Sequence, residues 1–451
     1  MLERAKLECI SCAVLWLGLG SLAAPARAER MSYLDNGVIR IGVDLDIGGS
    51  ITFLAVANDK DRPGENLINS HDLGRQVQQS YYAGPQPFGQ AHPGWKNWPW
   101  NPIGSGDVYG NSSKVKEFTN DGKTLHITTI PMQWALKNVP GECTFETTIT
   151  LEGPAARVHC RLNNHRPDKT AYPASNQELP AVYTIGKLYR LFTYDGTEPF
   201  TNAPLRLVKN DGPPWAFWKA TENWAALVDD KDHGVGVVNP GVYAFMGGFH
   251  DKPGKGGPKD NPTGYIAPSR FEILDHDIVY DYHYDLVVGP LEAIRAYAVA
   301  HRVQDPRPDY QFKADRQHWT YINASDAGFP PKGELKVKLD KNDPQMIGPE
   351  QWWKAESAPK LFIKAAYQGT GQDRAEVFWS VAGQEGFSGE RSLSFPIKAD
   401  GAYHTYEVDL SSSPHYRGTI TGLRFDPASA GAAGGEVRIE SISWKPSEPA
   451  K

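Results

Sequence analysis

The chain has 451 residues with a formal net charge of −6, and it contains 44 Gly, 35 Pro and 11% aromatic residues. This length allows two or three domains with substantial cores, and the absence of a Lys/Arg cluster argues against nucleic acid or an anionic membrane surface as partner. So much Gly, Pro and aromatic content is typical of a loop-rich all-β protein.

The amino-terminal segment has the pattern of a secretory signal. Arg4 and Lys6 precede an apolar run from Ile10 to Ala24, and Ala26–Ala28 fits a small-residue cleavage site. The apolar run is too short to span a bilayer comfortably. We therefore expect a signal peptide over residues 1–28, no membrane insertion, and a secreted or periplasmic mature protein.

Two cysteines follow the predicted signal. Cys143 and Cys160 bracket an apolar hairpin pattern with a turn at Gly153 and Pro154. In an exported protein, folding this hairpin would bring the two cysteines roughly opposite each other, so we expect a cross-strand disulfide. The alternative is a pair of buried free thiols.

The first large segment predicts an antiparallel β-sandwich. Apolar residues alternate from Val38 to Ile47, and a Gly48-Gly49 turn precedes the next strand at Ser50–Val56. This "strand, Gly-Gly, strand" opening, followed by Asp72-Leu73-Gly74-Arg75, resembles the galactose-mutarotase-like β-supersandwich of sugar epimerases, glycosidases and polysaccharide lyases. The resemblance implies that fold and a sugar ligand for a first domain over residues 29–303.

A second domain is predicted after a Pro-containing linker at residues 304–315. Evenly spaced strand candidates between turn signals indicate a β-sandwich of about eight strands over residues 316–451. The run from Gly401 to Trp444 resembles galactose-binding-like jelly rolls attached to exported carbohydrate-active proteins. Such modules either bind sugars or brace the neighbouring domain. The expected fold class is therefore all-β, a large antiparallel supersandwich followed by a smaller jelly-roll sandwich.

The stretch from Asn69 to Asp107 combines aromatic rings with amides, acids and an arginine. Flat rings cover the C–H faces of a sugar while polar groups bind its hydroxyls, so we predict a carbohydrate site. The alternative is an ordered loop that plugs the sheet and in which Asp72 pairs with Arg75. The candidate binding residues, including one beside Glu178, are His71, Arg75, Gln78, Tyr81, Tyr82, Trp95, Trp98, Trp100, Asn101 and Gln177.

Four carboxylates are candidates for catalysis, because glycoside hydrolysis usually requires two carboxyl groups that face one bond. Glu178 ranks first, since it precedes an apolar strand and Pro180 restricts the backbone beside it. Asp72, Asp107 and Glu222 follow. For each of them the structural alternative is a charge that holds a loop or pairs with arginine.

A lyase would instead need a base such as Tyr or His, and a group that neutralises a uronate carboxylate. Alternation places His283 on one strand face with Asp281 and Asp285, which would raise its pKa and make it a workable acid or base. Tyr81 and Tyr82 are further candidate bases, and Arg75 is a candidate for the neutralising group. The alternative is a strand that shows a polar face to solvent.

The sequence thus predicts a carbohydrate-active enzyme that hydrolyses a polysaccharide or oligosaccharide with Glu178 and Asp72 as its acid/base pair. A lyase of uronate-containing glycans and a non-catalytic glycan-binding cell-envelope protein are the alternatives. We expect no metal or other cofactor, because the sequence has no P-loop, HExxH, GxSxG or dinucleotide glycine pattern.

Overall fold

The computed structural model describes residues 30–57, 64–209 and 212–446. Antiparallel strands dominate this part of the chain, and one α-helix, α1 (Leu291–Ala300), accompanies them. The prediction of an all-β antiparallel protein is confirmed. The expected signal peptide over residues 1–28 lies outside the described residues. None of the described helices is long and apolar enough to cross a membrane.

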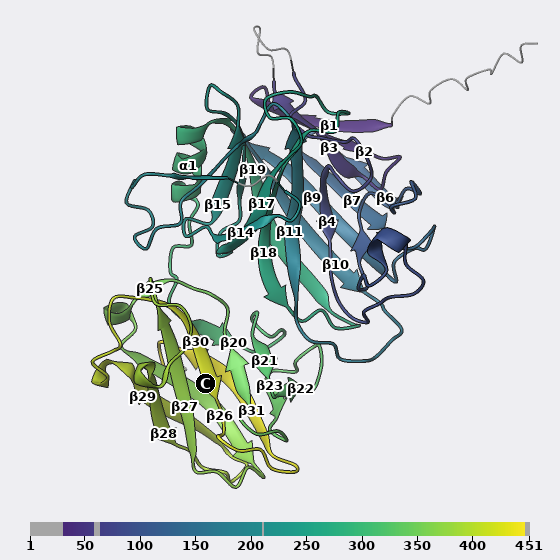
Figure 1. Ribbon diagram of the computed structural model, residues 1–451. Coiled ribbons are helices and arrows are strands. Elements are labelled where there is room, and N and C mark those ends of the chain that lie inside the picture. Colours follow the sequence, from purple (N-terminus) through teal and green to yellow (C-terminus); the bar gives the residue numbers. More distant parts are fainter. Residues whose placement is uncertain (1–29, 58–63, 210–211, 447–451) are drawn as a thin grey trace, which may run out of the picture.

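The first of two packed layers is a ten-stranded sheet in the upper half of Figure 1. Its main path, in spatial order, is β1 (Met31–Asp35), β2 (Ile39–Asp44), β3 (Ser50–Val56), β4 (Val77–Ser80), β11 (Ser175–Ile185), β18 (Thr263–Glu272), β17 (Ala244–His250) and β14 (Ala216–Lys219). Two short strands, β5 (Pro102–Ile103) and β8 (Met132–Gln133), continue it from β4.

The second layer is a nine-stranded sheet. Its order is β13 (Arg206–Val208), β12 (Arg190–Thr193), β15 (Trp224–Val228), β16 (His233–Val238), β19 (Val279–Pro290), β10 (Ala155–Asn164), β9 (Cys143–Glu152), β7 (Thr124–Ile130) and β6 (Lys114–Asn120). In β10 the side chains of Val158, Cys160 and Leu162 are buried while those between them are partly exposed, as a two-residue period requires. Apolar residues of both sheets join in one core.

Helix α1 covers part of the outer face of the nine-stranded sheet and contacts β15, β16 and β19. Leu291, Ile294 and Ala298 are its buried apolar residues, spaced three and four apart on one helix face. Pro290 stands directly before the helix, where its fixed φ and missing N–H are tolerated. Within the described residues no α-helix covers the ten-stranded sheet, so its outer face remains available for a site.

Residues 309–443 form two further sheets of six strands each (Figure 1, lower half). One comprises β22 (Ser325–Asp326), β23 (Leu335–Lys338), β31 (Glu436–Ser443), β26 (Lys360–Gln368), β29 (Tyr403–Asp409) and β20 (Asp309–Gln311). The other comprises β21 (Thr320–Ile322), β24 (Gln345–Ile347), β30 (Thr419–Asp426), β27 (Arg374–Val381), β28 (Ser392–Pro396) and β25 (Trp353–Lys354).

These two sheets enclose a separate core that includes Trp319, Trp379 and Phe425. The short strand β20 falls inside the segment 304–315 and pairs with β31. Four turns of 3-10 helix complete the secondary structure of the described residues: η1 (Pro93–Trp95), η2 (Ala355–Ser357), η3 (Gly389–Arg391) and η4 (Leu410–Ser412).

A buried charge cluster ties the two sandwiches together. Arg316 donates to Asp326 of its own sandwich and, through Nη2, to Asp275 of the first sandwich at 2.5 Å. All three side chains are buried. Beside this cluster, His318 Nδ1 lies 2.6 Å from a Glu272 carboxyl oxygen. The two sandwiches therefore share charges that neither can leave unpaired at low cost.

The predicted disulfide is wrong. In the β9–β10 ladder Cys143 stands opposite Asn164, and Cys160 stands opposite Thr147. The two cysteines are thus offset by four residues along the ladder, about 13 Å at the usual rise per residue and well beyond the reach of a disulfide. Both are free and buried, and burial raises the pKa of the Cys160 thiol to about 12.

We expect Cys143 and Cys160 to resist alkylation in the native protein, because the thiolate that reacts is both desolvated and scarce. Peptide mass spectrometry after iodoacetamide treatment without reductant should show both residues unmodified in buffer and both modified in denaturant. A linked peptide pair, or a failure of denaturant to expose the thiols, would contradict the register described above.

Replacing Arg316 by Gln should destabilise the protein by about 3 kcal/mol or more, because it leaves Asp275 and Asp326 buried without a counter-charge. The measurement is equilibrium denaturation. Lys360→Gln is the matched control, since its ion pair with Glu407 is about half exposed and should change stability far less. If the two substitutions changed the free energy of unfolding equally, the buried cluster would not hold the two sandwiches together.

Candidate functional site

A cleft of about 620 Å³ opens on the outer face of the ten-stranded sheet. Strands β4, β11, β18, β17 and β14 form its floor, and the loops after β4 and before β14 form its walls. Its lining is rich in aromatic rings and carries Glu178. The lining residues are Gly74, Gln78, Ser80, Tyr82, Trp95, Trp98, Asn101, Ile103, Trp134, Asn176, Gln177, Glu178, Ala181, Tyr183, Pro213, Pro214, Trp215, Phe217, Met246 and Ser269.

A β-bulge decides which side chains of β11 face the cleft. Glu178 and Tyr183 are five positions apart, so strict alternation would place them on opposite sheet faces. The register of β11 against β18 shifts between Glu178 and Val182, and both Glu178 and Tyr183 line the cleft. Glu178 stands opposite Ser80 of β4 and Ser269 of β18, which line the cleft with it.

The Glu178 carboxyl is held by hydroxyl donors. Tyr265 donates its phenol proton to Glu178 Oε1 at 2.5 Å. Burial raises the pKa of Glu178, while hydrogen bonds from Tyr265, Tyr82 and Ser80 lower it in part. Burial, together with the nearby Glu178 charge, also raises the pKa of Tyr265 well above its usual value, so this tyrosine stays a donor.

Two groups of rings flank this carboxyl. In the first, Trp95 packs against Trp98 with ring centroids 4.5 Å apart and against Trp134 at 5.9 Å, while Trp98 packs against Tyr82 at 5.9 Å. These contacts are edge-to-face, an arrangement that aromatic pairs prefer, and Tyr82, Trp95, Trp98 and Trp134 all line the cleft.

The second group comes from β11, β18 and the segment before β14. Tyr183 stacks on Tyr265 with centroids 4.6 Å apart, and Trp215 lies 4.9 Å from Tyr265. Ala181 and Met246 pack beneath them as a small apolar cluster, separate from the main core. Phe217 is 65% exposed at the edge of the cleft. An aromatic side chain so accessible is an available contact surface for a ligand.

The amides predicted to bind substrate instead hold the walls. Gln177 exchanges two hydrogen bonds with the backbone of Tyr82, at 2.7 and 2.8 Å. Asn101 accepts from Trp98 Nε1 at 2.8 Å and donates to the Tyr81 carbonyl. Gln78 likewise bonds to Ser105 and to the Arg75 carbonyl. These amides line the cleft, yet their bonds position the rings.

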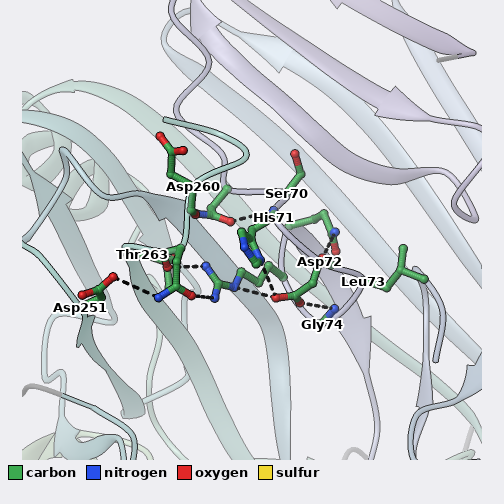
Figure 2. Close-up of polar contacts among 12 residues, drawn as sticks. Ser70, His71, Asp72, Leu73, Gly74, Asp251, Asp260 and Thr263 are labelled. Carbon is green, nitrogen blue, oxygen red and sulfur yellow. Dashed lines mark hydrogen bonds and ion pairs between the residues drawn. The ribbon is translucent and has the colours of Figure 1, made fainter. Parts of the chain in front are cut away.

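Asp72 lies beside the cleft in a network of its own (Figure 2). Its carboxylate is 3.1 Å from Arg75 Nε and 3.2 Å from His71 Nδ1, and it accepts from the Gly74 backbone. Arg75 in turn donates to Asn261. This matches the alternative in which Asp72 pairs with Arg75, and none of His71, Asp72 and Arg75 lines the cleft. The charge of Asp72 nevertheless reaches Tyr183, whose pKa is raised mainly by burial and also by Glu178 and Asp72.

The structure does not place Asp107 and Glu222 in the cleft. Asp107 is buried and accepts hydrogen bonds from the backbones of Tyr109, Asn111 and Asn138, so it closes a turn. Glu222 forms a buried ion pair with Arg295 at 2.8 Å and accepts from Trp224 Nε1. Both residues thus match the alternative given for them above: the Asp107 carboxylate holds a loop, and the Glu222 carboxylate pairs with an arginine.

His283 belongs to the other sheet. It stands opposite His159 in the β10–β19 ladder, and the two rings stack 4.4 Å apart. Asp281 and Asp285 act to raise its pKa, as expected, but burial and the charge of His159 outweigh them, so the expected net rise is wrong and the pKa is lowered. His283 therefore faces away from the cleft, on the outer side of the nine-stranded sheet.

Tyr81 and Trp100 belong to the core. Both are fully buried in the main cluster, with Tyr81 donating to Gln79 and Trp100 donating to Glu142. The segment that carries Trp98 and Trp100 is not a regular strand. Trp98 accordingly faces the cleft while Trp100 faces inward.

Several cleft residues were not predicted. Three of them are Trp134, Tyr183 and Trp215, which lie far apart in the sequence and outside the stretch from Asn69 to Asp107. Only the order of the strands in the sheet brings them together. The run Gly212-Pro213-Pro214-Trp215 is a usable signal, since prolines fix the backbone beside a large ring. Within the described residues no group of three or more His, Cys, Asp or Glu is arranged to hold a metal ion.

No protein-family model matches this sequence, and no protein of curated function matches it. Among solved structures, it is similar to a proposed aldose 1-epimerase from Escherichia coli K12, at 10% identity and a TM-score of 0.37, over 58% of this chain and 100% of that one. It is also similar to a galactose mutarotase-related enzyme from Lactobacillus acidophilus, at 12% identity and a TM-score of 0.34, over 57% of this chain and 97% of that one. A third similar structure is a galactose mutarotase-like protein from Lactobacillus casei, at 13% identity and a TM-score of 0.34, over 57% of this chain and 99% of that one. With TM-scores this low, the ligand must be inferred from the cleft itself.

Replacing Glu178 by Gln should raise stability near neutral pH. Burial raises the folded-state pKa of Glu178 above its ordinary value of 4.5. The contribution of Glu178 to the free energy of unfolding is therefore fully present below pH 4.5, and it is lost as the pH rises through the folded-state pKa. The melting temperature of the Glu178→Gln variant should therefore exceed that of the wild type at about pH 8, and the difference should vanish at about pH 4.

Asp72→Asn is the control for that experiment. It removes the attraction to Arg75 from a pair in which the Asp72 carboxylate is half exposed, so it should slightly lower the melting temperature at about pH 8. If the Glu178→Gln variant were less stable than the wild type at this pH, the desolvation of Glu178 would be contradicted.

Proposed function

We propose that the cleft binds sugar units of an oligosaccharide or polysaccharide. The observation that carries this proposal is the placement of one desolvated carboxyl, Glu178, between two groups of aromatic rings. Rings such as Trp98 and Trp215 suit the C–H faces of pyranose units, and the hydroxyls of Tyr82 and Ser80 suit sugar hydroxyls. The export proposed from residues 1–28 would give access to such polymers.

Glu178 is the proposed proton-transfer group. A carboxyl with a raised pKa retains its proton toward neutral pH, which is the property of a general acid that protonates a leaving oxygen. Tyr265 would steady the carboxylate left after that transfer, because its phenol donates to Oε1. The reaction we propose is hydrolysis of a glycosidic bond.

Hydrolysis by this route requires a second carboxyl that attacks or activates water. Asp72 is the candidate, because it lies beside the cleft, close enough to act on Tyr183, and is paired with Arg75. A lyase is less well supported. Among the described residues that line the cleft there is no Lys, Arg or His to neutralise a uronate carboxylate.

The test is a reducing-end assay on a panel of polysaccharides with purified mature protein. Glu178→Gln should lower the rate at least about a hundredfold, since general acid catalysis is worth that much or more. Asp72→Asn should also lower it. Glu117→Gln is the control, because Glu117 is an exposed carboxyl on β6 and should leave the rate unchanged.

Non-catalytic glycan binding is the second candidate, favoured by the fact that Glu178 is the sole carboxyl among the described residues that line the cleft. It predicts that Glu178→Gln and Asp72→Asn bind glycan as well as the wild type, and that no reducing ends appear. Release of unsaturated uronates, sensitive to Glu178→Gln, would contradict both candidates and favour elimination.

A further inference from the structure

A second cleft, of about 430 Å³, lies at the junction of the two sandwiches. Lys219 and Thr221 line it from the first sandwich, while Glu350, Trp352 and Phe387 line it from the second. Nothing in the catalytic proposal uses this cleft. Its lining mixes aromatic rings, hydroxyls and charged groups, as the lining of the first cleft does.

The two clefts meet on one strand, β14. Phe217 lines the first cleft and Lys219 lines the second, and the two side chains share one face because Trp218 between them is buried in the core. Alternate residues of a strand are about 7 Å apart. A ligand that leaves the first cleft over the exposed ring of Phe217 therefore reaches the second cleft directly.

The rings of the second cleft are held in place. Trp352 Nε1 donates to Glu350 Oε1 at 2.9 Å, and the indole lies nearly parallel to Tyr243 with centroids 5.9 Å apart. Lys219 Nζ lies 3.4 Å from the same Glu350 carboxyl oxygen, so residues of both sandwiches fix this wall. Phe387 is half-buried in a loop of the second sandwich and offers a further apolar surface.

Neither cleft favours an anionic ligand. The second cleft contains three carboxylates, Asp195, Glu350 and Glu385, against the single cation Lys219 among its described lining residues, which lies within 3.5 Å of two of them. The first cleft contains Glu178 and no cation among its described lining residues. A uronate or a sulfated sugar would be repelled in the second cleft and would meet no cation to neutralise it in the first.

We infer that one uncharged glycan chain occupies both clefts, with one part between the rings around Glu178 and the next part at the junction of the sandwiches. This inference rests on the proposed function, and it adds a second binding site and a substrate class. The second sandwich then takes part in binding the chain that the first sandwich acts on.

Calorimetric titration with uncharged oligosaccharides, from disaccharide to octasaccharide, tests this inference on the Glu178→Gln variant, which prevents turnover. The series that binds best should gain affinity with length beyond what the first cleft holds. Phe387→Ala should remove about tenfold of that gain for the longest member and leave the shortest unchanged, since stacking on one ring is worth about that much.

Ile322→Ala is the matched control, because Ile322 is a half-exposed apolar side chain of the same sandwich that lines neither cleft. It should change no affinity in the series. A far-UV circular dichroism spectrum and a thermal transition like those of the wild type show that the second sandwich of the Phe387→Ala variant is folded.

Three results would overturn the inference. If Phe387→Ala lowered the affinity for short and long members equally, or lowered neither, the second cleft would not bind the glycan, and the proposed function would still stand. Equally tight binding of a uronate oligosaccharide of matched length would contradict the substrate class. Binding of no oligosaccharide of any length would refute the proposed function together with the inference.

Discussion

The β-bulge in β11 is the constraint on which the candidate site depends. It shifts the register between Glu178 and Val182, and so brings the carboxyl and Tyr183 to the same outer face. Without it, the carboxyl or the ring would point into the sandwich core. The bulge also aligns Glu178 with Ser80 and Ser269 on the neighbouring strands, so that sheet pairing itself assembles the floor of the cleft.

Keeping an acid on this floor opposes stability. The ionised form of Glu178 is disfavoured by burial and is compensated only in part by Tyr265, Tyr82 and Ser80. The surroundings nevertheless maintain it, with amides such as Gln177 fixing the rings that desolvate the carboxyl. A group that is strained in this way, inside a cleft, is the kind of group that function rather than folding explains.

The sequence predicted secondary structure well where buried and exposed side chains alternate regularly along a strand. Alternation in β2 and β10 and the turn at Gly48-Gly49 follow from local patterns, and with them the all-β class. Part of the stretch from Asn69 to Asp107 lines the cleft, since Tyr82, Trp95 and Trp98 lie there together with Glu178. Local patterns could not show that Trp215 joins them across the sheet.

Other errors have the same origin. The cysteines flank one hairpin, yet only the register of the turn decides whether Cys143 meets Cys160, and here it does not. Glu222 lies two residues before Trp224, but its ion-pair partner Arg295 comes from helix α1, far along the chain. His283 has acidic neighbours in the strand, but the opposing His159 and burial determine its pKa. In each case the deciding contact is long-range.

A crystal structure of the Glu178→Gln variant with an uncharged oligosaccharide would test the central claim most directly. The account predicts sugar rings against the faces of Trp98 and Trp215, with a glycosidic oxygen within hydrogen-bond distance of the side chain at position 178. Sugar bound only on other surfaces, with the cleft around residue 178 empty, would contradict it.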